Sequence, residues 1–148
     1  MSNKSKQAGT KFETAIVNYI NEWAGEKVCE RIVMYGNKDH GDIRLKVDDF
    51  AFTIEAKWRK KYPNDALEQD FRKQTDTETR NAYTDGGLLV MNKYGCNISR
   101  AEVWMRIETA CRIFGTCDLM EPSTDDSDWL CMRMSDFCQT CFGDPATQ

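Results

Sequence analysis

Apolar and other residues alternate strictly over residues 43–57, and this stretch predicts the best-defined element of the chain. Apolar side chains occupy every second position from Ile43 to Val47 and again from Phe50 to Ala56, with Asp48-Asp49 between the two runs. Such a pattern predicts a β-hairpin with a two-residue turn, in which Asp42 lies opposite Glu55. One face of the hairpin then belongs to the core, and the other carries both carboxylates together with Lys57.

A second pattern, with apolar residues at helical spacing, predicts a helix that begins at Thr10 and ends at Gly25. Thr10 and Glu13 have the spacing of an N-terminal capping box, and residues 1–9 are expected to fray. On a helical wheel, however, Glu13 projects into the apolar arc. An ionised group that faces the core needs a partner, and a metal ion is one such partner.

The rest of the chain predicts three further strands and three further helices. Residues 27–34 predict a strand, 35–41 a polar loop, 63–82 a helix that begins at Pro63-Asn64-Asp65, and 88–91 a buried strand. Ser99 and Glu102 have capping-box spacing and predict a helix over 103–115, which an acidic loop follows. The segment from Trp129 to Met134 predicts a last strand, and Ser135 is expected to cap a closing helix.

Composition restricts the class of protein. With 148 residues, of which 41% are hydrophobic and 30% charged, the chain is long enough for one domain and short for two. No apolar run approaches the ~20 residues of a membrane span, and no secretory leader is evident, so we expect a cytoplasmic protein with no membrane partner. Seven cysteines are an odd number, which suits buried thiols better than a disulfide framework.

The net charge of -4 is unevenly distributed. Residues 108–148 hold eight acids and two bases, so the rest of the chain carries 18 bases and 16 acids. A basic group lies close to the hairpin in sequence and predicts a nucleic-acid surface beside the two carboxylates. Its members are Lys57, Arg59, Lys60, Lys61, Arg72 and Lys73.

Glu13, Asp42, Glu55 and Lys57 together predict a catalytic site. Three carboxylates are hard oxygen ligands of the kind that bind Mg²⁺ or Mn²⁺, and a lysine beside them can orient a water or stabilise charge on a phosphate. That combination is suited to phosphodiester hydrolysis. Three accessory residues have open roles: Asp39 and His40 are surface residues of the polar loop or hold a water or a phosphate, and Gln74 either faces the substrate or lies on an exposed helix flank.

Several motifs carry a resemblance to a known family. They are G-x-x-F-E at 9–13, Arg31, G-x-x-D-x-G-D-I at 36–43, E-A-K at 55–57 and L-L-V-M at 88–91. The chain resembles the PD-(D/E)XK nuclease superfamily, with Gly41 at the position of the proline. Within that superfamily it is most similar to the small Holliday-junction resolvases of archaea and tailed phages, and W-L-C-M-R-M-S-D-F at 129–137 resembles the closing strand and helix of the phage members.

The resemblance implies a restriction-endonuclease-like α/β fold, with an α-β-β-β-α-β core and a mixed central sheet flanked by helices. Residues 10–94 would form the catalytic core, 95–128 a helical insertion with the acidic loop, and 129–148 a closing strand and short helix. Glu13, Asp42 and Glu55 would bind the metal, Lys57 would be the catalytic lysine, and Arg31 would contact a phosphate. Family members often act as homodimers on four-way DNA junctions, so DNA is the expected partner, in a host cytoplasm if the protein is viral.

Three other interpretations stay open at this point. A restriction-like or nicking endonuclease would have the same fold and the same site. A non-catalytic nucleic-acid-binding module would keep the fold but has no need of all four site residues. A zinc module would use Cys138 and Cys141 with Cys131, Cys117 or Cys111, although only one C-x-x-C pair is present.

Overall fold

Six strands form a single mixed sheet in the computed structural model, which describes residues 3–32, 42–115 and 128–144. In sheet order, which is also chain order, the strands are β1 (Cys29–Arg31), β2 (Ile43–Val47), β3 (Phe50–Lys57), β4 (Gly86–Met91), β5 (Glu102–Arg106) and β6 (Trp129–Arg133). β3 and β4 are parallel, and every other neighbouring pair is antiparallel. The sheet is therefore mixed, as predicted.

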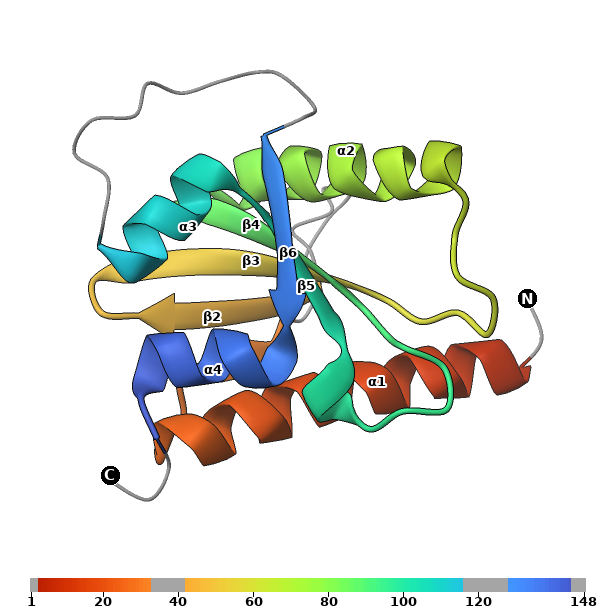
Figure 1. Ribbon diagram of the computed structural model, residues 1–148, viewed down its shortest axis with the longest axis horizontal. Coiled ribbons are helices and arrows are strands. Elements are labelled where there is room, and N and C mark those ends of the chain that lie inside the picture. Colours follow the sequence, from red (N-terminus) through yellow and green to blue (C-terminus); the bar gives the residue numbers. More distant parts are fainter. Residues whose placement is uncertain (1–2, 33–41, 116–127, 145–148) are drawn as a thin grey trace.

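Helices cover both faces of this sheet (Figure 1). They are α1 (Asn3–Ala24), α2 (Asp65–Ala82), α3 (Ile107–Phe114) and α4 (Met134–Phe142), with a 3-10 turn, η1, at Ile98–Arg100. The main core lies between the sheet and α1, α3 and α4, whereas α2 covers the opposite face through a smaller cluster around Phe71, Leu89 and Met91. The predicted order α-β-β-β-α-β is confirmed, because α1, β1, β2, β3, α2 and β4 follow one another along the chain. Among the described helices, none has the length and apolar character needed to cross a membrane.

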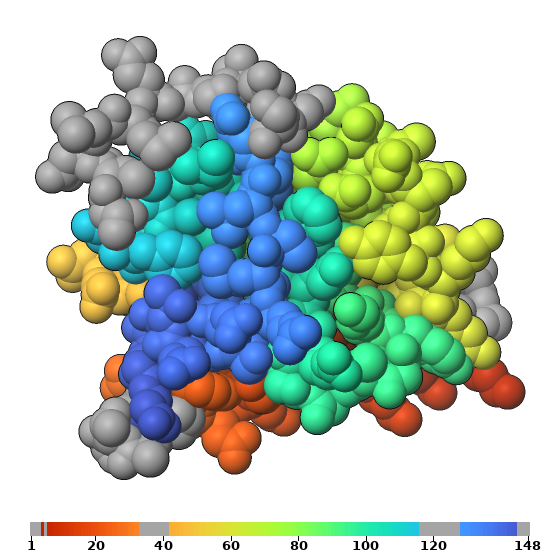
Figure 2. All heavy atoms as spheres, in the orientation of Figure 1, coloured from red at the N-terminus to blue at the C-terminus, as the bar shows by residue number. Residues whose placement is uncertain are grey.

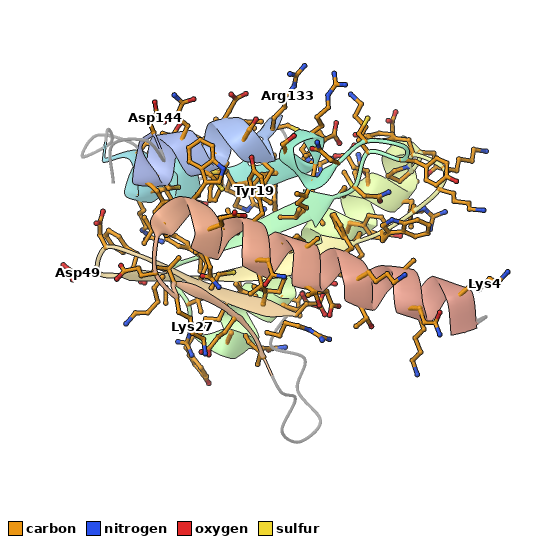
Figure 3. All side chains as sticks on the ribbon, turned by 90° about the horizontal axis from the view of Figure 1, so that it is seen from below. Lys4, Tyr19, Lys27, Asp49, Arg133 and Asp144 are labelled. Atoms are coloured by element: carbon orange, nitrogen blue, oxygen red, sulfur yellow. The ribbon has the colours of Figure 1, made fainter. Side chains whose placement is uncertain are left out.

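The β2–β3 hairpin has the predicted register. Ile43 pairs with Ile54, Leu45 with Phe52 and Val47 with Phe50, and the turn at Asp48-Asp49 places Asp48 in the left-handed region at φ 52°. Asp49 lies at the tip of this hairpin, at one end of the molecule (Figure 3). Since side chains alternate across a strand, this register puts the side chains of residues 55 and 57 on the face away from the main core.

Burial on β3 departs from the simple alternation that the sequence predicts. Phe50 is 36% exposed, whereas Thr53 and Glu55, on the face predicted to be polar, are 0% and 5% exposed. The reason is α2, which packs on this second face and shields the middle of β3 from water. The polar face is therefore open over β2 and enclosed over β3, and Glu55 lies in the enclosed part.

Helix α1 begins earlier than predicted. It starts at Asn3, so Thr10 lies inside the helix, where its hydroxyl donates to the Lys6 carbonyl at 3.1 Å. The predicted capping box of Thr10 and Glu13 is therefore wrong, and so is the prediction that residues 3–9 fray. The predicted end is confirmed: Gly25 follows the helix at φ 72°, a conformation that favours glycine.

The side chain of Asn21 on α1 holds the edge strand β1. Its Oδ1 accepts hydrogen bonds from the backbone N–H groups of Val28 and Cys29, both at 2.9 Å, and its Nδ2 donates to the Cys29 carbonyl at 2.9 Å. The predicted strand over 27–34 is shorter in the structure, where β1 covers only Cys29–Arg31. Residues 33 and 34 lie outside the described residues. Asn21 thus supplies to β1 the bonds that a further strand would supply.

The predicted helix over 103–115 is wrong in its first half. Residues 102–106 form strand β5, and the helix α3 begins only at Ile107. Ser99 and Glu102 do not form a capping box, because Asn97 caps η1 by accepting from the Ser99 N–H. The segment predicted as a helical insertion therefore contributes a strand to the central sheet. The acidic loop at 116–127 lies outside the described residues.

At the C-terminal end the predicted strand and helix are both present. Strand β6 pairs with β5, and helix α4 follows it directly. The predicted cap is wrong: the N-cap position is Arg133, without a side-chain cap bond, and Ser135 lies inside the helix. The helix predicted to begin at Pro63-Asn64-Asp65 is confirmed: α2 spans Asp65–Ala82, and the Asn64 side chain caps it by accepting from the Leu67 N–H.

A close approach of α2 to β4 gives a first prediction, for Gly87→Ala. A Cβ atom at this position would overlap the hydroxyl of Thr79 and lie 2.9 Å from Cγ2 of Thr75, so the helix would have to move away from the sheet. We expect urea unfolding to show a loss of about 1–3 kcal/mol. Gly9→Ala is the control, because nothing lies within 4 Å of its Cβ position inside α1 and the change should stabilise the protein by about 0.5–1 kcal/mol. Equal stability of Gly87→Ala and wild type would contradict the close approach.

Candidate active site

Asp42 and Glu55 lie side by side at the open end of the β2–β3 hairpin. The Asp42 N–H donates to the Ile54 carbonyl at 3.2 Å, which extends the hairpin register by one residue. The Asp42 carboxylate accepts a hydrogen bond from the Ala56 N–H at 3.0 Å, and Ala56 directly follows Glu55 in the chain. The hairpin register therefore brings the two predicted carboxylates together, as the sequence indicates.

Lys57 is held between β3 and α2. Its Nζ forms an ion pair with Oε1 of Glu55 at 2.9 Å and donates to Oε1 of Gln74 on α2 at 2.9 Å. The same ammonium lies 5.1 Å from the centre of the Phe71 ring. Its side chain is 25% exposed, against 6% for Glu55, so Lys57 reaches from the buried carboxylate towards solvent. Gln74 lies on an exposed flank of α2 and also contacts Lys57, and its contact with a substrate stays a prediction.

Glu13 reaches the same end of the sheet from the other layer. It extends from α1, is 19% exposed, and pairs with Nη2 of Arg31 on β1 at 2.7 Å. Glu13 is therefore not turned out to water, and the inward direction predicted for it is confirmed. Arg31, predicted as a phosphate contact, is 49% exposed and now has a defined partner in this carboxylate.

The electrostatics of Asp42 show that the three carboxylates interact. The pKa of Asp42 is raised to about 7, first by burial and then by the negative charges of Glu55 and Glu13. The bond from the Ala56 N–H and the charge of Lys57 act in the opposite direction without cancelling the rise. A carboxyl with this pKa is partly protonated at neutral pH, chiefly because it is buried and secondly because two further carboxylates lie near it.

The fit of this site to a divalent cation rests on two observations. Oε2 of Glu55 is buried and has no hydrogen-bond partner in the described part of the chain, which leaves one hard oxygen available. On the other hand, residues 3–32, 42–115 and 128–144 contain no group of three or more His, Cys, Asp or Glu side chains arranged to hold a metal ion. Glu13 and Glu55 each form an ion pair instead, with Arg31 and with Lys57. The donor types fit Mg²⁺ or Mn²⁺, and the metal stays a prediction.

The predicted basic residues divide into two groups. Arg59, Lys60 and Lys61 are exposed on the segment that follows β3, next to Lys57. Arg72 is only 14% exposed, pairs with Glu68 at 3.1 Å and lies over the Trp129 ring, so it faces another part of the protein. Lys73 is exposed on α2 beside Gln74. Asp39 and His40 lie outside the described residues.

Three residues near the site were missed in the sequence: Asn92, Lys93 and Tyr94. They follow β4, and because β3 and β4 are parallel, this segment leaves the sheet at the same edge as the segment after β3 (Figure 1). The Asn92 side chain accepts from the Arg59 N–H at 2.6 Å and donates to the Arg59 carbonyl at 2.8 Å, which ties the two segments together. A prediction that strands 50–57 and 88–91 run parallel would have pointed to these residues.

The zinc interpretation finds no support in the described residues. Cys138 is buried in the main core, with its thiol 3.9 Å from the Met134 sulfur, and Cys131 is exposed on β6. Cys141 packs against the same core as Cys138. The thiols of Cys138 and Cys141 pack as small apolar side chains, and the described ranges hold no cluster of metal-binding type.

Comparison with known proteins supports the fold. No family model matches the sequence, and no curated protein sequence matches it. Among solved structures, the chain is similar to Hjc of Archaeoglobus fulgidus, a Holliday junction resolvase from an archaeal hyperthermophile, with a TM-score of 0.52 and 16% sequence identity. The similarity covers 88% of this chain and 99% of the Hjc chain. The chain therefore has the mixed α/β fold of an archaeal Holliday junction resolvase.

Proposed function

We propose that the protein is a divalent-metal-dependent DNA endonuclease of the resolvase type, acting on four-way junctions. The observation that carries the proposal is the meeting of Asp42, Glu55 and Lys57 at the end of one hairpin, with Glu13 directed to them from α1. The likeness to Hjc supports it at the level of the fold. A protein that only binds DNA would have no need to bury a carboxylate beside a lysine in this way.

Glu13, Asp42 and Glu55 are the residues that would hold Mg²⁺ or Mn²⁺. Such an ion supplies a reactive water at neutral pH and neutralises charge on the scissile phosphate. Oε2 of Glu55 has no partner among the described residues to lose on binding, and the negative charges of Glu55 and Glu13 beside the buried Asp42 favour a cation. On binding, Arg31 would part from Glu13 and become available to a phosphate oxygen.

Lys57 has two roles in this proposal. Its Nζ can donate to the attacking water or to a non-bridging oxygen of the phosphate, which stabilises the negative charge that develops there. The bonds to Glu55 and Gln74 fix the ammonium before the substrate arrives, so little reorganisation is needed during the reaction.

The test is cleavage of labelled DNA. A four-way junction, a duplex and a single strand of matched sequence are incubated with the protein in Mg²⁺ or in EDTA. Paired, symmetric nicks in the junction alone, and only with Mg²⁺, are the expected result. Equal cutting of all three substrates would favour a general or restriction-like nuclease, and no cutting of any of them would contradict an enzymatic role.

Symmetric nicks require two sites, so the proposal includes a homodimer, as is common among the resolvases that the chain resembles. The segment Trp129–Phe137, which resembles the closing strand and helix of phage members, supports a phage type. Light scattering of the purified protein, alone and on a junction, gives the number of subunits. A monomer on the junction would contradict paired cutting.

A second prediction concerns Gln74→Leu. The change removes the acceptor that holds Lys57 from the α2 side while keeping the size of the side chain. We expect kcat to fall about 10–100-fold with little change in KM, because the lysine is less well positioned but substrate contacts remain. Gln69→Leu, on an exposed position of the same helix, is the control and should cut like wild type. A normal kcat for Gln74→Leu would remove Gln74 from the site.

A further inference from the structure

A basic and aromatic groove continues from Lys57 away from the carboxylates. It has a volume of about 320 Å³ and lies between the segment that follows β3 and the segment that follows β4. The residues that matter for its chemistry are Lys57, Arg59, Lys60, Lys93, Tyr62 and Tyr94. These two segments meet at one side of the molecule, where the yellow and green parts of the chain adjoin (Figure 2).

The groove has a rigid floor. The last pairs of the parallel strands are Ala56 with Val90 and Lys57 with Met91, and beyond them the Asn92 side chain bonds to both the N–H and the carbonyl of Arg59. This side chain continues the β3–β4 pairing by two residues. The positions of the cationic residues relative to the site are therefore set by the sheet itself.

The charge of the groove suits a phosphate chain. Four of its side chains are cationic, and no acidic side chain of the described residues lines it. Arg59, Lys60 and Lys93 are exposed, and none of the three forms an ion pair with an acid in the part of the chain that the structure describes. Their charge is thus available to a polyanion, and it begins directly at the Lys57 ammonium.

Two tyrosine rings add a second kind of recognition. Tyr94 is 59% exposed and stands edge-on to Trp58, with 6.2 Å between ring centres and an interplanar angle of 74°. Tyr62 is 52% exposed, and its hydroxyl donates to Oε1 of Glu102 at 2.7 Å. Both rings are held by neighbours yet keep apolar surface open to solvent, as in proteins that stack unpaired bases.

We propose that this groove binds an unpaired segment of the DNA next to the scissile phosphate, with its phosphates on Arg59, Lys60 and Lys93 and a base stacked on Tyr94. The proposal rests on the proposed function, because it takes the scissile phosphate to be at Lys57. An intact duplex keeps its bases stacked on one another, so the tyrosines would gain nothing from it. Unpaired nucleotides are present at a gap or a flap, and at a four-way junction where base pairs next to the branch point open.

The test compares binding of two DNA molecules in EDTA, so that no cutting occurs. One is a continuous duplex, and the other carries a short single-stranded flap. Tyr94→Ala should weaken flap binding about 5- to 100-fold, the range expected for one base stack, and leave duplex binding unchanged. Tyr94→Trp should restore the affinity. Tyr83→Ala is the matched control, because Tyr83 is 86% exposed at the C-terminal end of α2 and does not line the groove.

A direct readout is the fluorescence of 2-aminopurine placed in the flap, which is quenched when the base stacks on an aromatic ring. Quenching by wild type and its loss in Tyr94→Ala would support the proposal. Equal weakening of both DNA molecules by Tyr94→Ala, no weakening of either, or no quenching would overturn it. If the protein cuts no DNA but quenches the flap, the proposed function fails and the groove stands; if it cuts junctions and Tyr94→Ala binds like wild type, only the groove fails.

Discussion

Replacing Lys57 with alanine should lower kcat for DNA cleavage by at least about 10³-fold and change DNA binding by only a few-fold. Two effects combine in this variant. The ammonium that stabilises charge on the phosphate is lost, and Glu55, which is 6% exposed, loses its ion-pair partner. Binding is retained because the exposed cations that follow β3 remain in place. Single-turnover cleavage and anisotropy, measured with one labelled DNA, separate the two effects.

Lys46→Ala is the control for this variant. Lys46 lies on β2, on the same face of the sheet as Lys57, but it is exposed and does not contact the carboxylates. Loss of this charge should leave kcat close to that of wild type. Normal cleavage by Lys57→Ala, or an equal loss in both variants, would contradict the assignment of Lys57 as the catalytic lysine.

Stability should fall as the pH rises through the range in which Asp42 ionises. Its pKa is about 7 in the folded protein and 3.8 in the unfolded chain, so between these values the folded state binds more protons. By linkage, raising the pH from about 4 to about 7 removes between about 2 and 4 kcal/mol of stability, the lower figure allowing for partial burial of the carboxyl. Urea unfolding without metal at about pH 4 and about pH 7 measures this change.

Asp42→Asn removes the titrating group and should flatten this part of the pH profile. Mg²⁺ gives an independent check, since a ligand that binds only the folded state stabilises it by about 2.7 kcal/mol at 100 times its Kd. That gain should appear in wild type near pH 8 and be much smaller in Asp42→Asn. The same pH slope in both proteins would show that other groups cause it, and no effect of Mg²⁺ would argue against the metal.

The site could be predicted because it depends on a short-range pattern. The strict alternation in β2 and β3 and the two-residue turn at Asp48 fix the register, and the register alone brings Asp42 to Glu55 and sets Lys57 on the same face. The direction of Glu13 followed from helical periodicity in the same way. Neither inference required knowledge of which segments meet in space.

The wrong or missing predictions have two causes. Either a segment fits the spacing of both a strand and a helix, or no local pattern marks the feature. Over 102–106, Val103 and Met105 face the core in a strand, but their spacing to the apolar residues of α3 also fits one continuous helix. Lys4, Lys6 and Gln7 in the first turns of α1 are polar and exposed, so no apolar pattern reveals this part of the helix. The two hydrogen bonds from the Asn92 side chain to the Arg59 backbone join residues far apart in sequence. They depend on the parallel pairing of β3 with β4.

The attachment of β1 to α1 through Asn21 has a consequence for hydrogen exchange. The amide protons of Val28 and Cys29 are bound to one side-chain oxygen, so they should exchange slowly although they lie at the border of the sheet. Their exchange should require the helix and the strand to separate. Because Arg31 and Glu13 lie on these same two elements, that opening would also break their ion pair, and the rate at which these two protons are lost would report how often the end of the protein that carries the proposed site opens.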